Sequence, residues 1–179
     1  MERSSADSQE KLLYQGEHLS LKQTGSWEFV ERRGKAGGVM VVAVTPEEDL
    51  LLVEEYRPPV GGHVISLPAG LVGDGGKAED PAEAARRELC EETGYEAAAL
   101  EFLGGGPSSP GLASERVSFF FARDVRKTGE PTAEESITLH LVPLPRVRSW
   151  AREREREGAL IHPLLWAALY LAFPAAGAP

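Results

Sequence analysis

The chain of 179 residues is long enough for one domain with a small additional element and too short for two full-sized domains. Its 19 Lys and Arg residues against 28 Asp and Glu residues give a formal net charge of −9, which disfavours nucleic acid and anionic membranes as partners. A single cysteine, Cys90, excludes an intrachain disulfide, and the longest apolar run, Leu164–Phe173, is too short to cross a bilayer. We therefore expect a soluble, cytoplasmic protein.

The first predicted elements form an N-terminal appendage over residues 11–37, after a polar and flexible stretch at residues 1–10. Three short segments, Leu12–Tyr14, Leu19–Gln23 and Trp27–Arg32, are separated by glycine-containing turns and indicate a small antiparallel β-meander. Strands this short bury little apolar surface by themselves. We therefore expect the meander to pack against the main body or against a second subunit.

The main domain is predicted over residues 38–174, followed by a flexible end at residues 175–179. Asp80 is a typical N-cap, Pro81 suits the first helical position and Gly94 a C-terminal cap, so these signals predict a helix over residues 81–93. Two further helices are predicted at residues 146–157 and 163–173, and a polar loop at residues 104–111. Strands are predicted at residues 39–44, 50–56, 64–67, 99–103, 116–122 and 137–142. This mixture predicts an α/β fold in which helices cover a sheet.

Three glutamates gather on one face of the first predicted helix. Glu88, Glu91 and Glu92 lie at positions i, i+3 and i+4, so their carboxylates project together and repel one another. They lie near the helix C-terminus, where negative charge is unfavourable, and they need a compensating cation. Hard divalent cations such as Mg²⁺ take oxygen ligands of this kind, whereas an ordinary solvated acidic face is the alternative.

The residues around these glutamates decide between the two interpretations. The segment from Gly73 to Tyr95 follows the spacing G-x5-E-x7-R-E-U-x-E-E-x-G-U, in which U is usually a bulky aliphatic residue. The residues at its fixed positions are Gly73, Glu79, Arg87-Glu88-Leu89, Glu91-Glu92 and Gly94-Tyr95. This pattern resembles the Nudix box, and Tyr95 at the last position is its one departure.

The resemblance implies a Nudix α/β/α sandwich with a mixed sheet and the hydrolysis of a nucleoside diphosphate linked to another moiety. It implies that Glu88, Glu91 and Glu92 bind Mg²⁺ or Mn²⁺, that Arg87 orients the glutamates, and that Glu79 braces the loop before the helix. In such a site Arg87 and Glu91 belong to the catalytic machinery. Metal ions are needed because a diphosphate is anionic and repels an attacking hydroxide.

Two segments outside the box are similar to ADP-ribose and ADP-sugar pyrophosphatases. Residues 109–116 resemble the S-P-G-x-x-S-E-R loop of the bacterial enzymes. The ADP-sugar enzymes have segments similar to Arg57-Pro58-Pro59 and Leu67-Pro68-Ala69-Gly70-Leu71. By this resemblance the Ala69 carbonyl binds metal, Glu115 contacts the terminal ribose or its phosphate, and Arg57 holds the diphosphate. A planar guanidinium suits that last task.

The third predicted strand carries the residues that the resemblance assigns to adenine. Trp27 would stack on the base, Glu28 would hydrogen-bond it, and Arg32 would complete the subsite, whereas simple packing of Trp27 on the body is the alternative. If the first interpretation holds, the appendage forms part of the site, and we expect a homodimer in which it crosses to the second subunit.

The catalytic base is expected just before the last predicted strand. Residues 134–141 resemble a loop and strand of the bacterial enzymes, and the best register places the base at Glu135, with Glu134 as its neighbour and two solvated glutamates as the alternative. The four scattered histidines are interpreted as outside any metal site.

The sequence thus predicts a magnesium-dependent enzyme that converts ADP-ribose or a related ADP-sugar to AMP and a sugar phosphate. Two alternatives are a Nudix hydrolase for other nucleoside diphosphate derivatives and a non-hydrolytic ADP-ribose sensor. The complete set of box glutamates counts against the sensor, because a protein that only binds has no need of them.

Overall fold

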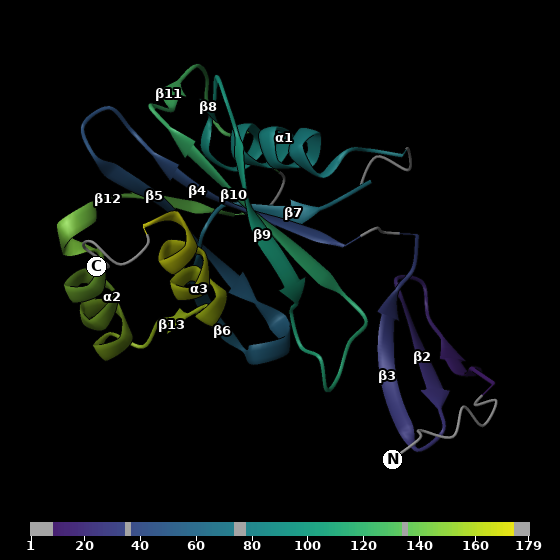
Figure 1. The fold of residues 1–179 in the computed structure, drawn as a ribbon. Helices are drawn as coiled ribbons and strands as arrows, with labels where there is room; N and C mark the ends of the chain where they lie inside the picture. Colours follow the sequence, from purple (N-terminus) through teal and green to yellow (C-terminus); the bar gives the residue numbers. More distant parts are fainter. Residues whose placement is uncertain (1–8, 35–36, 74–77, 134–135, 174–179) are drawn as a thin grey trace, which may run out of the picture.

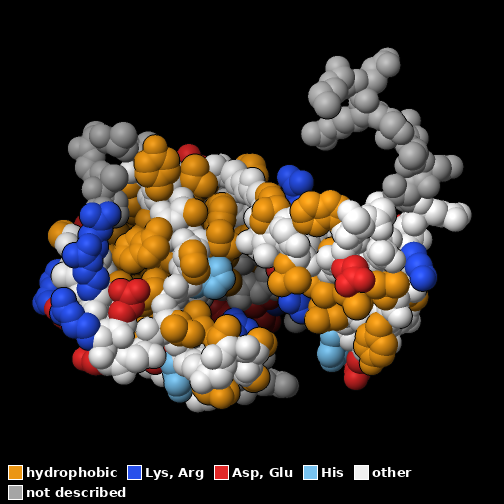
Figure 2. Space-filling model, turned by 90° about the horizontal axis from the view of Figure 1, so that it is seen from below, with side chains coloured by type: hydrophobic (Ala, Val, Ile, Leu, Met, Phe, Trp, Pro, Cys, Tyr) orange, Lys and Arg blue, Asp and Glu red, His pale blue; other side chains and the backbone are white. Residues whose placement is uncertain are grey.

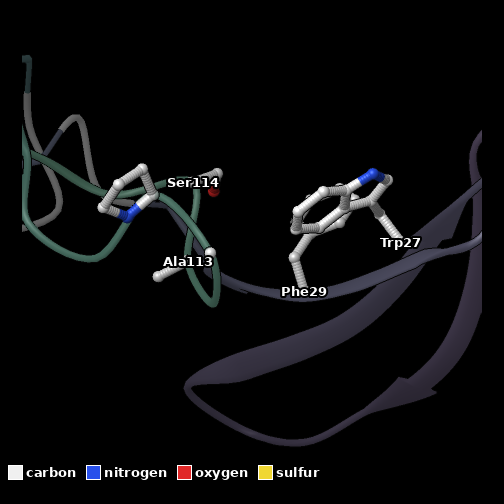
Figure 3. A pocket seen from close by; sticks show the side chains of 6 residues that line it. Trp27, Phe29, Ala113 and Ser114 are labelled. Atoms are coloured by element: carbon white, nitrogen blue, oxygen red, sulfur yellow. The ribbon is translucent and has the colours of Figure 1, made fainter.

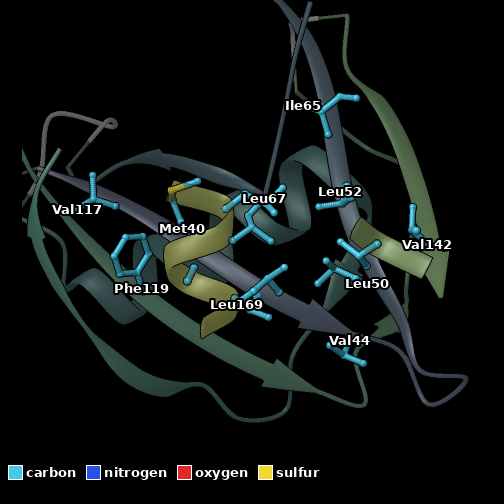
Figure 4. Packing of buried hydrophobic residues seen from close by; sticks show 14 residues of the cluster. Met40, Val44, Leu50, Leu52, Ile65, Leu67, Val117, Phe119, Val142 and Leu169 are labelled. Carbon is cyan, nitrogen blue, oxygen red and sulfur yellow. The ribbon is translucent and has the colours of Figure 1, made fainter. Parts of the chain in front are cut away.

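Alternate side chains along the strand β4 (Gly38–Val44) enter two separate hydrophobic cores, and this alternation sets the layers of the molecule. Val39, Val41 and Ala43 pack in one core with helix α1 (Pro81–Thr93). Met40, Val42 and Val44 pack in the other with helices α2 (Val147–Arg156) and α3 (Pro163–Ala172) (Figure 4). The main body is therefore a sheet with α1 on one face and α2 and α3 on the other (Figure 1).

The computed structural model describes residues 9–34, 37–73, 78–133 and 136–173. Within these residues the main sheet has eight strands, and its order is β13-β6-β5-β4-β10-β9, with β12 paired to β5 and β7 paired to β4. β10 runs parallel to β4 and β13 parallel to β6, and the other pairs of this sheet are antiparallel. The bounds are β5 Asp49–Arg57, β6 Gly62–Ser66, β7 Ala69–Leu71, β9 Glu101–Pro107, β10 Arg116–Arg123, β12 Thr138–Pro143 and β13 Leu160–Ile161.

The two central strands separate soon after the turn that joins them. β4 and β5 share one residue pair, Val44 with Leu50. Beyond it β4 pairs with β7, and the far end of β5 pairs with β6. The N–H group of Val41 donates to the carbonyl of Pro68 (2.9 Å), so a short crossing segment satisfies part of the exposed strand edge. The sheet is thus open between β4 and β5.

A second, antiparallel sheet of three strands precedes the main body, as the sequence predicted. It consists of β1 (Lys11–Gln15), β2 (Leu19–Thr24) and β3 (Trp27–Arg32). Backbone hydrogen bonds join β3 to the loop before β10: the N–H of Val30 donates to the Leu112 carbonyl (2.8 Å), and the N–H of Ser114 donates to the Val30 carbonyl (3.0 Å). The meander is therefore joined to the main body through β3 and this loop (Figure 1).

The structure corrects the predicted loop at residues 104–111, because β9 continues to Pro107 through three consecutive glycines. A side chain at Gly105 would place its Cβ 2.5 Å from the Val117 carbonyl oxygen, so glycine is what permits this close pairing with β10. The short strands β7 and β13, and the pair formed by β8 (Tyr95–Glu96) and β11 (Arg126–Lys127), were not predicted. With two or three residues each they show no period.

The remaining elements are the short 3₁₀ turns η1 (Pro58–Val60) and η2 (Leu144–Arg146). None of the helices in the described part of the chain is long and apolar enough to cross a membrane. The predicted flexible ends lie outside the described residues, apart from residues 9 and 10.

Substitution of Gly94 tests how helix α1 ends. Gly94 has φ = 73° and donates its N–H to the Cys90 carbonyl (2.8 Å), and an added Cβ would lie 2.4 Å from the Gly129 carbonyl oxygen. We expect Gly94→Ala to lower the free energy of unfolding by about 2–4 kcal/mol, because backbone strain and a clash with backbone add. Gly61→Ala is the control, since Gly61 has φ = 61° and open space around it, and should cost about 1 kcal/mol. Equal losses in urea denaturation would contradict the role of close packing.

Candidate active site

A cavity of about 850 Å³ lies where β4 and β5 separate. Its walls come from both central strands, from β7, from α1, from the loop before β10 and from the start of α3. Figure 2 shows a hollow between the main body and the smaller lobe, with Asp and Glu side chains at its bottom. Most residues that the sequence assigned to the site line this cavity: Arg32, Arg57, Ala69, Arg87, Glu88, Glu91, Glu92 and Glu115.

Helix α1 presents the three glutamates to this cavity. The Asp80 side chain accepts from the Ala82 N–H (2.8 Å), and Pro81 occupies the first turn, so the helix begins where the sequence predicted. Glu88 and Glu92 are buried, each with 8% of its surface exposed, whereas the Glu91 side chain is 42% exposed. Two of the three carboxylates therefore have little access to water.

Arg87 connects the glutamates to the segments that precede the helix. Its Nη1 donates to Glu88 and to Glu91 (2.9 Å each), and its Nε donates to Glu79 (3.0 Å). Its Nη2 donates to the Leu71 carbonyl in β7 (3.0 Å). The Glu79 carboxylate, in turn, accepts from the Gly73 N–H (2.9 Å). The hydrogen bond to Glu79, together with the other carboxylates, raises the pKa of Arg87 above its ordinary value.

The Glu92 carboxylate lies against the turn into β7. It accepts a hydrogen bond from the Ala69 N–H (3.0 Å). Burial raises the pKa of Glu92 to about 8, and the nearby charges of Glu88 and Glu55 act in the same direction. The Ala69 N–H and the charge of Arg57 act in the opposite direction. Burial thus makes the ionised form of Glu92 unfavourable when no cation is bound.

Gly70 makes room for the second buried carboxylate. A Cβ at this position would lie 1.9 Å from the carboxyl carbon of Glu88. A residue with any side chain would displace that carboxylate from the cavity wall. The sequence carried Gly70 within the resemblance to ADP-sugar enzymes, but it gave no sign of this contact.

These residues fit a divalent cation that also binds the substrate. No group of three His, Cys, Asp or Glu side chains among the described residues is arranged to hold a metal by itself. Magnesium, however, is ordinarily bound by one or two carboxylates together with substrate phosphates and water. Buried carboxylates that repel one another, with a raised pKa at Glu92, match that requirement. The Ala69 carbonyl remains a predicted ligand.

The opposite parts of the cavity wall carry the other charged residues. Arg57 forms an ion pair with Glu55 (2.7 Å), and its charge also reaches Glu92 and His162. Arg32 of β3 donates to Glu115 (3.1 Å), which also accepts from the Ser108 hydroxyl (3.3 Å). The cavity therefore has an acidic side at α1 and guanidinium groups at β5 and β3.

Two of the residues assigned to adenine lie away from this cavity. Trp27 lines a smaller pocket of about 250 Å³ with Phe29 and the loop residues Pro110, Gly111, Ala113 and Ser114. Figure 3 shows the Trp27 and Phe29 rings on one side of the pocket, facing the loop that carries Ala113 and Ser114. Trp27 is 64% exposed, so most of its side chain is accessible from solvent. Glu28 is exposed and lines neither pocket.

The predicted base, Glu135 or Glu134, lies outside the described residues. The flanking residues Ala133 and Ile137 line the cavity. The N–H groups of Thr132 and Ala133 donate to the Glu91 carbonyl (2.8 and 3.0 Å), so the segment before the two glutamates is anchored to the end of α1.

Sequence reasoning missed several polar side chains of this site, and Glu55 and His162 are the two that can carry a charge. Glu55 follows an apolar run in β5, where alternation places it on the same face as Val53, and both line the cavity. His162 precedes Pro163 at the start of α3, which is an N-cap signal, but nothing in the sequence places that cap in the cavity.

Comparison with known proteins identifies the pattern. The model of the NUDIX domain matches residues 34–160. The chain is 39% identical over 105 residues to the methanol dehydrogenase activator of Bacillus methanolicus, covering 59% of this chain and 54% of that protein. It is 39% identical over 89 residues to the ADP-ribose pyrophosphatase of Bacillus subtilis, covering 50% and 46%. It is 39% identical over 100 residues to the ADP-sugar pyrophosphatase of Mus musculus, covering 51% and 44%.

The chain spans about half the length of these curated relatives. Among solved structures, one described as an ADP compounds hydrolase superposes with a TM-score of 0.71 at 21% identity, covering 92% of this chain and 89% of the other. That likeness confirms the predicted α/β/α fold.

Replacement of Glu92 tests whether its buried charge is uncompensated without metal. Because the pKa of Glu92 is raised from 4.5 to about 8, the folded state resists deprotonation, and Glu92 lowers the stability of the metal-free protein as the pH rises between these values. Glu92→Gln keeps an acceptor for the Ala69 N–H and carries no charge. We expect it to stabilise the metal-free protein at pH 7 by about 1–3 kcal/mol, or roughly 3–10 °C in Tm, with no gain near pH 4.5.

Thermal denaturation with and without Mg²⁺ measures this effect. Mg²⁺ should raise the Tm of the unaltered protein more than that of Glu92→Gln. The control is Glu83→Gln, which removes an exposed carboxylate from the first turn of the same helix. It should leave the Tm increase caused by Mg²⁺ unchanged and should not stabilise the metal-free protein, because negative charge is favourable at a helix N-terminus. A metal-free Glu92→Gln protein no more stable than the original at pH 7 would contradict the expectation.

Proposed function

This chain belongs to the NUDIX family, and from that premise we propose that it hydrolyses the diphosphate bond of ADP-ribose or a related ADP-sugar, giving AMP and a sugar phosphate. The observation that carries the proposal is the acidic cluster of α1, which Arg87 organises in the same cavity as Arg57. These charges match an anionic diphosphate, which would bind between the metal-binding carboxylates and the guanidinium. The names of the Bacillus subtilis and mouse relatives point to the same substrates.

The metal site of this proposal consists of Glu88, Glu91, Glu92 and the Ala69 carbonyl. Mg²⁺ or Mn²⁺ bound there would neutralise the phosphate oxygens and acidify a water. Arg87 keeps Glu88 and Glu91 in place, and the Ala69 N–H does the same for Glu92. The protein thereby fixes the carboxylates before the substrate arrives, which lowers the cost of binding.

The remaining polar residues of the cavity bind the organic parts of the substrate. Arg57 holds the diphosphate, since a planar guanidinium pairs with two phosphate oxygens at once. Glu115, held by Arg32 and Ser108, accepts hydrogen bonds from the hydroxyl groups of the terminal ribose. Glu135 is the general base, with Glu134 as its alternative.

The N-terminal sheet supplies the adenine subsite in this proposal. Trp27 stacks on the base, Glu28 hydrogen-bonds it, and Arg32 joins this subsite to Glu115. The sheet also exposes large apolar side chains, namely Leu12, Tyr14, Leu19 and Trp27. Such a patch favours a partner surface, and we assign it to a homodimer in which residues 11–37 complete the site of the main domain, residues 38–174.

The acidic chain has no charge pattern for nucleic acid as a partner, and its single cysteine suits a cytoplasmic location. A small nucleoside diphosphate sugar is therefore its proposed partner.

A substrate panel tests the reaction. We expect AMP release from ADP-ribose only when Mg²⁺ or Mn²⁺ is present, and a fall of at least a hundredfold in Glu92→Gln. The panel includes other nucleoside diphosphate sugars and nucleoside triphosphates, with products separated by chromatography. Turnover of those compounds alone would replace the substrate and keep the chemistry, whereas tight binding of ADP-ribose without turnover would favour a sensor.

The base assignment has its own test. We expect Glu135→Gln to lower kcat at least tenfold with an unchanged Tm, because it removes a proton acceptor and preserves size. Glu134→Gln is the matched neighbour and should retain most of its kcat. Full turnover of Glu135→Gln, or a larger loss in Glu134→Gln, would reject the assignment.

A further inference from the structure

His162 joins the start of helix α3 to the wall of the large cavity. Its backbone N–H donates to the Ile65 carbonyl of β6 (2.9 Å), and its Nδ1 accepts from the Leu164 N–H (3.2 Å). The first bond fixes the backbone, and the second fixes the ring as the N-cap of α3. The imidazole is therefore held in one orientation before any ligand binds.

The capping hydrogen bond also fixes the protonation of the ring. A nitrogen that accepts a hydrogen bond carries no proton, so neutral His162 carries its proton on Nε2. Burial, and then the charge of Arg57, lower the pKa of His162 below its ordinary value of 6.5. At neutral pH the ring is thus an uncharged N–H donor.

The Nε2 atom is available to a ligand. Within the described part of the chain no hydrogen-bond partner of Nε2 is found, and the one buried side-chain nitrogen or oxygen without a partner is Nε of Arg154. Nε2 therefore remains in contact with solvent. His162 and Arg57 both line the large cavity, and the charge of Arg57 acts on the imidazole.

Capping alone does not explain a histidine at this position. Asn, Asp, Ser and Thr are the preferred N-cap residues, and each would accept from the Leu164 N–H with a smaller side chain. The carboxamide of Asn also combines an acceptor with a donor, but the imidazole carries its donor on the far side of a ring, at a greater distance from the helix backbone.

We propose that His162 is a substrate-binding residue whose Nε2–H donates a hydrogen bond to a phosphate oxygen of the nucleoside diphosphate held by Arg57. This inference rests on the proposed function and adds a residue to it. The guanidinium attracts the diphosphate through its charge. A neutral donor beside it adds a directional hydrogen bond, which fixes where the phosphate oxygen lies without adding further charge.

Steady-state kinetics with ADP-ribose separate binding from capping. His162→Ser keeps a helix cap and removes the imidazole with its Nε2–H donor, and we expect it to raise KM about tenfold with kcat within about threefold and an unchanged Tm. His162→Asn keeps a cap and a shorter donor and should raise KM by less. The control, His18→Ser, replaces an exposed histidine outside both pockets and should change nothing. A residue that served only as a cap would leave the KM of His162→Ser unchanged, and that result would overturn the proposal.

Two further readouts distinguish this inference from the proposed function. Long-range ¹H–¹⁵N NMR of the metal-free protein should show His162 protonated at Nε2 at pH 7, and a proton at Nδ1 would overturn the inference whatever the substrate is. Calorimetric titration with the non-hydrolysable α,β-methylene analogue of ADP-ribose should give a Kd about tenfold weaker for His162→Ser. Equal affinities would overturn the role of His162 alone, whereas no binding by the unaltered protein would overturn the proposed function with it.

Discussion

The guanidinium of Arg87 is the interaction on which the candidate site depends. Three carboxylates near the C-terminal end of one helix repel one another and are opposed by the helix dipole. Arg87 supplies a positive charge between Glu88 and Glu91, and it also reaches Glu79 and the Leu71 carbonyl. One side chain thereby sets the positions of the helix, the preceding loop and β7 relative to one another. Because it is only 29% exposed, solvent weakens these ion pairs less than it would on an open surface.

The separation of β4 and β5 gives the cluster its place. A continuous sheet would have no room for a cavity between its central strands, but here β4 turns to β7 and β5 turns to β6. The carboxylates of α1 approach the opening over Ala69 and Gly70, where one backbone N–H and one missing Cβ accommodate them. The helices on the two faces cover this irregular region, and each packs on one set of alternating β4 side chains.

The three-stranded N-terminal sheet is attached to the same region through β3. Two backbone hydrogen bonds and the Arg32–Glu115 ion pair join it to the loop between β9 and β10. This loop lines both pockets, since Ser108 and Glu115 face the large one while Pro110 and Ser114 face the small one. The same loop therefore contributes side chains to both pockets. It joins the proposed subsites for the terminal ribose and for adenine.

The sequence by itself determined the features that depend on local spacing. Asp80, Pro81 and Gly94 set the limits of α1, and the spacing from Gly73 to Tyr95 identified the acidic face and its arginine. The three N-terminal strands followed from their turns. What only the tertiary structure decided depends on contacts between distant residues. Glu55 and His162 enter the cavity because β5 separates from β4 and α3 begins beside β6, and Trp27 lies in a second pocket because β3 joins a distant loop. The glycines of β9 form a strand because β10 pairs with them. No local pattern encodes such pairings, since they arise only when the strands meet.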